Sequence, residues 1–123
     1  MPQTVKWLPK PSKHDFQAAE DYLSLIMPAK RAAEYRKKLV AARDEVTHRK
    51  AKDILRASQL DLLGEDNKHV ASDLRKAASG AALSPILLLR GDDGHPLVIA
   101  DGYHRVCASY WIDENTDIPC VMV

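Results

Sequence analysis

The strand-to-helix corner of this chain reads Leu97-Val98-Ile99-Ala100-Asp101-Gly102-Tyr103-His104-Arg105. Residues 97–100 form an uninterrupted apolar run of strand length, and residues 103–112 have the composition of a helix. Gly102, between the two, can adopt a positive φ or let a ligand approach the backbone closely. Because the unbonded N–H groups at the start of a helix attract anions, this corner predicts a site for a nucleotide or another phosphorylated ligand.

Four side chains at this corner are candidates for chemistry. Arg105 carries a permanently charged fork of donors that suits phosphate oxygens, and His104 can donate a hydrogen bond or titrate near neutral pH. Asp101 could cap the helix or hold a metal ion, and the ring of Tyr103 could stack on a base or fill space in the core. A purely structural role, in capping or in a salt bridge, is equally open for Asp101 and Arg105.

Residues 83–123 contain four features in succession. A strand opens with Pro85-Ile86, a turn follows at residues 91–94, a second strand leads into the Gly102 motif and its helix, and a final strand begins near Ile118-Pro119. This order resembles the ParB/sulfiredoxin superfamily. The resemblance implies an α+β fold with a small mixed β-sheet packed with helices, here with an enlarged N-terminal helical block.

The branches of this superfamily differ at the motif, so each can be compared residue by residue. Sulfiredoxins carry a catalytic Cys just before the His-Arg pair. This chain has Tyr103 there, so we expect no sulfiredoxin activity. ParB proteins have Gly-Glu-Arg-Arg and bind a cytidine nucleotide, and this chain keeps the Gly102 and Arg105 positions. The free-serine kinases, with Asp-Gly-His-His-Arg, are the most similar at the motif, because this chain departs from theirs only at Tyr103.

This resemblance implies a nucleotide site with defined roles. The nucleotide would be ATP or CTP with Mg²⁺, and its terminal phosphate would be transferred to a small-molecule acceptor or hydrolysed. Asp101 would act as a general base or metal ligand, and His104 would be a second catalytic residue.

Further residues of the implied site belong to the helix that precedes the Pro85-Ile86 strand. Ser72 resembles the phosphate-contacting Ser of the family, His69 falls where sulfiredoxins have a Lys, and Lys68 beside it offers an ammonium group. The alternative is that Lys68, His69 and Lys76 form a solvated helix face. The implied nucleotide-binding set is Gly102, Tyr103, His104, Arg105, Ser72, Lys68 and His69.

Length and composition fit one domain, since 123 residues that are 46% hydrophobic can furnish a single core. We expect that domain to span residues 1–123, with a helical insertion at about 14–80 and a motif-bearing sheet region at about 83–123. The expected helices run from Ser12 or Asp15 to Met27, from Pro28 to about Val46, from Lys52 to Leu60 and from Val70 to Gly80. A short strand around Val5 is expected to join the C-terminal strands, and Cys107 and Cys120 are expected to be buried and reduced.

Charge is distributed unevenly along the chain. The formal net charge of +1 argues against strong non-specific binding to nucleic acid or to an anionic membrane. Residues 30–56, however, hold ten Lys or Arg and four Asp or Glu. The alternative to a nucleotide-dependent enzyme is therefore a non-catalytic ParB-like module that acts through its basic helix on a protein or nucleic-acid partner. The apolar stripe of the same helix could instead pair two copies in a homodimer.

Targeting and metal-site patterns are absent from the sequence. No stretch has the apolar core of a signal peptide or approaches the ~20 residues needed to span a bilayer, so we expect a cytoplasmic protein without membrane contact. The five His are scattered without the spacing of a zinc site. A metal ion is therefore expected only together with the nucleotide.

Overall fold

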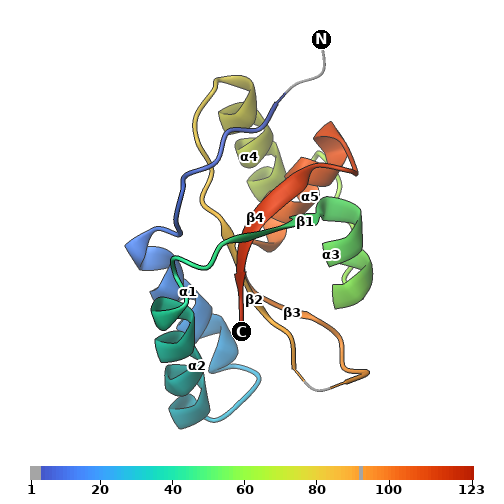
Figure 1. Cartoon of the computed structure of the whole chain (residues 1–123). Coiled ribbons are helices and arrows are strands. Elements are labelled where there is room, and N and C mark those ends of the chain that lie inside the picture. The colour runs from blue at the N-terminus through green and yellow to red at the C-terminus, as the bar shows by residue number, and fades with distance from the viewer. Residues whose placement is uncertain (1–3, 92) are drawn as a thin grey trace.

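A mixed β-sheet lies between two groups of helices (Figure 1). The computed structural model describes residues 4–91 and 93–123, and over these residues it has five helices and four strands. The helices are α1 (Lys13–Leu23), α2 (Ala29–Ala41), α3 (Ala51–Ser58), α4 (Lys68–Ala78) and α5 (Tyr103–Ile112). The strands are β1 (Thr47–Lys50), β2 (Ile86–Leu89), β3 (Val98–Asp101) and β4 (Asp117–Met122). The expected α+β class is confirmed.

The sheet has the strand order β1-β4-β2-β3. Strands β2 and β4 are parallel, while β1 pairs with β4 and β3 pairs with β2 in antiparallel orientation. All residues of β2 are buried, as the unbroken apolar run predicts for a strand covered on both faces. The hairpin turn between β2 and β3 was expected at residues 91–94, of which Asp92 lies outside the described residues.

Two apolar cores follow from the alternation of side chains along the strands. Leu88 packs with α3, α4 and α5 in one core, and its neighbour Leu87 packs with α1 and α2 in the other. Ala32 and Leu39, from the predicted stripe of α2, are fully buried in that second core. This face of the helix is therefore used, at least in part, within its own chain.

Two expectations about strands were wrong. The segment around Val5 does not join the C-terminal strands, because its only described pairing is an isolated parallel bridge between Trp7 and Leu83. The predicted long helix ends at Ala41, and Thr47–Lys50 instead forms the edge strand that pairs with β4. All residues of β1 are exposed and polar, so the strand has no apolar alternation that would reveal it.

The remaining local predictions agree with the structure to within a few residues. Asn67 caps α4 through hydrogen bonds from the backbone N–H groups of His69 and Val70. Cys107 and Cys120 are free and buried, as expected. None of the helices within residues 4–91 and 93–123 is both long and apolar enough to cross a membrane.

Candidate functional site

The corner between β3 and α5 depends on Gly102. This residue has φ 112° and ψ 17° and occupies the N-cap position of α5. A Cβ atom there would lie 2.4 Å from Cγ2 of Ile86, so the close approach of the corner to β2 requires glycine. No side chain of residues 4–91 or 93–123 caps the first turn of α5. The N–H groups of that turn therefore remain free of side-chain acceptors and can face an anion.

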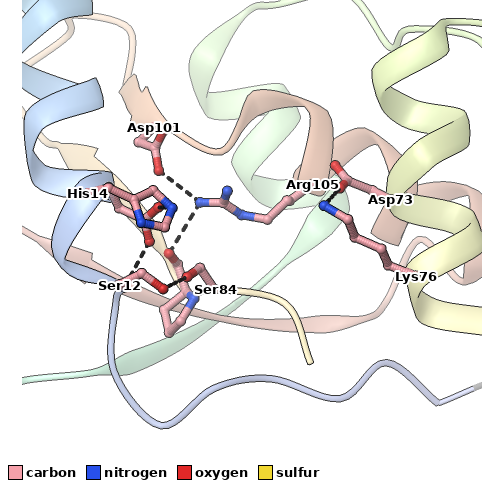
Figure 2. A network of polar contacts seen from close by, with 9 residues as sticks. Ser12, His14, Asp73, Lys76, Ser84, Asp101 and Arg105 are labelled. Carbon is pink, nitrogen blue, oxygen red and sulfur yellow. Dashed lines mark hydrogen bonds and ion pairs between the residues drawn. The ribbon is translucent and has the colours of Figure 1, made fainter. Parts of the chain in front are cut away.

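Arg105 and Asp101 form an ion pair across the first turn of α5. Nη2 of Arg105 lies 3.0 Å from Oδ2 of Asp101 and also donates to the carbonyl oxygen of Pro85 at 3.3 Å. Figure 2 shows the guanidinium group pointing toward Asp101, with Asp73 and Lys76 on the other side of the Arg105 stem. Nε of Arg105 is buried and has no hydrogen-bond partner in the described part of the chain. Arg105 is thus held in place with donor capacity left over.

The start of α1 lies beside this ion pair (Figure 2). The Oγ atoms of Ser12 and Ser84 are 2.8 Å apart, and the carboxylate of Asp15 accepts a hydrogen bond from the Ser12 backbone N–H at 2.9 Å. Burial raises the pKa of Asp101 despite the attraction of Arg105, and the negative charge of Asp15 raises it further. The surroundings therefore make Asp101 easier to protonate than an exposed carboxylate.

A polar cavity of about 180 Å³ lies between α4 and the β3–α5 corner. It is lined by His69, Ser72, Asp73, Lys76, Asp101, Gly102, His104 and Arg105. Four of these residues belong to α4: His69, Ser72, Asp73 and Lys76. They are three, one and three positions apart, which places them on one face of the helix. Lys76 and Asp73 form a long ion pair on that face, with 3.9 Å between Nζ and Oδ1.

Two histidines meet in this cavity. The ring centroids of His69 and His104 are 4.7 Å apart, and the rings are tilted by 44°. Burial lowers the pKa of His104, and a positive charge on His69 would lower it further. Burial also raises the pKa of Asp73, against the attraction of the nearby cations. His104 is therefore expected to be neutral at pH 7 and able to accept a proton.

An apolar hollow of about 390 Å³ adjoins the polar cavity, and the two share Asp101, Gly102 and His104. Its further lining residues are Ala18, Tyr22, Leu60, Ile99, Ala100 and Tyr103. The Tyr103 hydroxyl donates a hydrogen bond to the carbonyl oxygen of Asp61, and its ring stacks on His104 at 5.7 Å between centroids. Tyr103 is therefore held in the wall of the apolar hollow, beside His104.

No family model, curated protein or solved structure matches this chain. The resemblance to the ParB/sulfiredoxin superfamily therefore stays a prediction from the motif.

Most of the predicted site residues lie around the polar cavity. His69, Ser72, Asp101, Gly102, His104 and Arg105 line it, and Tyr103 lines the adjoining hollow. Lys68 is exposed and does not line either hollow. The cation that α4 contributes is instead Lys76, joined by Asp73. Helical spacing from His69 and Ser72 could have identified both residues in the sequence.

The donor set for a metal ion is incomplete at this site. Within residues 4–91 and 93–123, no group of three or more His, Cys, Asp or Glu side chains is arranged to hold a metal ion. Asp101 is the carboxylate expected to bind Mg²⁺, and Arg105 already donates to its Oδ2 atom. Because Mg²⁺ prefers six oxygen ligands, most of them would have to come from phosphate and water.

Proposed function

We propose that this protein is a ParB/sulfiredoxin-like nucleotide-binding domain. The polar cavity would hold the phosphates of ATP or CTP, and the adjoining apolar hollow would hold the base. The observation that supports this most is the meeting of the two hollows at Asp101, Gly102 and His104. A nucleotide joins a polyanion to an aromatic base, so its binding site needs both environments side by side.

The phosphate end of this proposal rests on the cationic and N–H groups around the polar cavity. Lys76 and Arg105 contribute charge from opposite walls, and the first turn of α5 has no cap from any side chain that the structure describes. The hydroxyl of Ser72 adds a hydrogen-bond donor. The ion pair with Asp101 fixes the orientation of the Arg105 guanidinium, so less side-chain entropy is lost when phosphate binds.

We further propose that the bound nucleotide is turned over. The attacking hydroxyl of an acceptor or a water molecule would give its proton to neutral His104 as its oxygen bonds to the terminal phosphorus atom. The bond from that phosphorus to the bridging oxygen would break, and the nucleoside diphosphate would leave with the electron pair. Asp101 would orient Arg105, which neutralises charge on the transferred group. Mg²⁺, held by the phosphates and by Asp101, would supply additional charge neutralisation.

Calorimetric titration of ATP, CTP, GTP and ADP, with and without Mg²⁺, tests the binding proposal. Lys76→Gln is expected to weaken binding about tenfold or more, because a charge-assisted hydrogen bond contributes about 1.5–3 kcal/mol. Lys68→Gln is the matched control, since both lysines lie on α4 and are exposed but only Lys76 lines the cavity. Equal affinities for the two variants, or no binding by the wild type, would refute the site.

Phosphate release in the same samples tests turnover separately. His104→Gln is expected to keep most of the affinity and to lose release, because Gln can donate a hydrogen bond but cannot accept the proton as a base. Binding without release by the wild type would leave a nucleotide-binding protein and remove the catalytic assignment of His104.

A second candidate is a non-catalytic module that acts on an acidic partner through α2. A hollow of about 310 Å³ with an apolar floor and a basic rim lies against this helix, lined by Glu20, Ala33, Arg36, Lys37, Val40 and Ala41. Arg36 is partly neutralised by Glu20 at 3.3 Å. Lys37→Glu should then lower the salt concentration at which the protein elutes from a heparin column more than Lys68→Glu does. Equal shifts would count against this candidate.

A further inference from the structure

A cavity of about 480 Å³, larger than either hollow of the candidate site, lies at the opposite end of β3, under the end of α3. Its lining residues are Arg49, Asp53, Ile54, Ala57, Leu88, Arg90, Gly94, His95, Leu97 and Met122. It shares no residue with the polar cavity or with the apolar hollow beside it. This volume lies within the range of about 300–1,000 Å³ that is usual for small-molecule sites.

The cavity exists because the helical layer ends before the sheet does. Helix α3 has 8 residues and stops at Gln59, whose left-handed backbone (φ 59°) turns the chain away. The sheet continues past this point, and Leu97 and Met122 are left only partly buried. A hydrogen bond from the Leu97 N–H to the Ala57 carbonyl oxygen, 2.9 Å, ties the helix end to the start of β3. The apolar wall is thus built on regular, mutually bonded elements.

Cationic side chains stand at the rim of this apolar wall. Arg49 of β1 lies opposite Ile118 in the register of the sheet, and Leu88 lies opposite Met122. Arg90 follows Leu88 by two residues, so both arginines emerge on the same sheet face as the apolar wall. Neither arginine forms an ion pair with any residue in the described part of the chain.

The acidic group of the cavity does not cancel this charge. Asp53 is the lining carboxylate, and its Oδ1 atom already lies 3.6 Å from Nη2 of Arg56. A ligand for this cavity therefore needs one anionic end and one apolar body. An arginine fork matches the two oxygens of a carboxylate in particular.

We propose that this cavity binds an amphipathic carboxylate, a molecule with one carboxylate group on a hydrocarbon or aromatic body. The carboxylate pairs with one of the two rim arginines, Arg49 or Arg90, which the register places at different levels along β4. The body covers Ile54, Leu88 and Met122. This site is independent of the proposed nucleotide site, because the two lie at opposite ends of β3 and no lining residue is common to both.

Methyl NMR of methionine-labelled protein tests the proposal with octanoate as the probe. The chain has three methionines, of which Met122 lines the cavity and Met27 packs in the other core. Octanoate is expected to shift the Met122 methyl signal in a saturable way and to leave Met27 unchanged. Acetate, which lacks the apolar body, and octanol, which lacks the charge, should each bind at least about tenfold more weakly.

Variants decide which groups recognise the probe. Of Arg49→Gln and Arg90→Gln, the variant that removes the arginine paired with the carboxylate should weaken octanoate binding about tenfold, whereas Arg75→Gln on α4, away from the cavity, should not change it. Ala57→Phe, which fills the cavity from α3, should abolish the Met122 shift. An unmoved Met122 signal, octanol binding as tight as octanoate, or unchanged affinity in both cavity arginine variants would each overturn the proposal. The Arg49→Gln variant should bind nucleotide as tightly as the wild type. Failure of the carboxylate site can therefore be distinguished from failure of the nucleotide site.

Discussion

Replacing Gly102 by Ala tests the packing of the β3–α5 corner. The new Cβ would lie 2.4 Å from Cγ2 and 2.9 Å from Cβ of Ile86, and 2.9 Å from Nη2 of Arg105. Because Ile86 is fully buried in β2, it cannot move aside without disturbing the core. The variant also keeps a backbone with φ 112°, which an L side chain rarely adopts.

The loss in free energy of unfolding that we expect for Gly102→Ala has two parts. Positive φ costs a non-glycine residue about 1–2 kcal/mol, and overpacking a well-filled site costs typically about 1–3 kcal/mol more. Gly94→Ala is the matched control, since Gly94 has φ 80° but a Cβ atom added there would meet no described atom within 4 Å. The difference between the two variants isolates the steric part, about 1–3 kcal/mol. That is a large share of the ~5–15 kcal/mol by which small domains are stable.

Urea unfolding followed by far-UV circular dichroism measures both losses. Substitutions at Ile86 then test whether contact with its Cγ2 methyl group causes the loss of stability. Ile86→Leu removes the β-branch methyl group and should reduce the cost of Gly102→Ala, whereas Ile86→Val keeps that methyl group and should not. If Gly102→Ala costs no more than Gly94→Ala, the close approach of the corner to β2 is not what demands glycine, and the reasoning fails.

Two further predictions concern single side chains near the site. Burial raises the pKa of Asp73, so its contribution to stability is full below the ordinary value of 3.8 and is lost as pH rises through the raised value. Asp73→Asn should therefore raise the free energy of unfolding, relative to the wild type, more at pH 7.5 than at pH 4. Equal effects at the two pH values in urea unfolding would contradict the raised pKa of Asp73. Tyr103→Phe removes the hydrogen bond to the Asp61 carbonyl oxygen and should cost about 0.5–1.5 kcal/mol in the same assay; an unchanged midpoint would show that this bond contributes nothing.

The local elements of the fold were readable from the sequence. The apolar run of β2 and the corner at Gly102 carry patterns that act over a few residues, so their structure depends little on distant parts of the chain. The helices α3, α4 and α5 were also located to within a few residues, because helical periodicity and end signals are local. The α+β class followed from these elements.

Strand β1 could not be read in this way. Thr47–Lys50 is polar and exposed throughout, and it is a strand because its backbone groups pair with β4 about seventy residues later in the chain. The segment around Val5 is the opposite case: its residues alternate as in a strand, yet the structure gives it only the bridge between Trp7 and Leu83. An edge strand is defined by its partner, and the partner is chosen by the tertiary fold.

The candidate site also contains residues that the sequence identifies and residues that only the tertiary structure brings to it. Asp101, Gly102, His104 and Arg105 form one continuous motif, so the sequence was sufficient to propose them together. Which face of α4 meets that motif was decided by the packing of α4 on α5, and this packing places Lys76 at the cavity and leaves Lys68 in solvent.

The cavity under α3 was decided by tertiary structure alone. Arg49 and Arg90 are far apart in the sequence and sit in segments with no shared pattern. They line one cavity because β1, β4 and β2 are neighbours in the sheet, and because α3 ends before it covers the strands. Sequence patterns determine which elements form, since they reflect interactions over one or two turns. The placing of side chains from different elements around one cavity depends on strand order and helix length, which only the folded chain establishes.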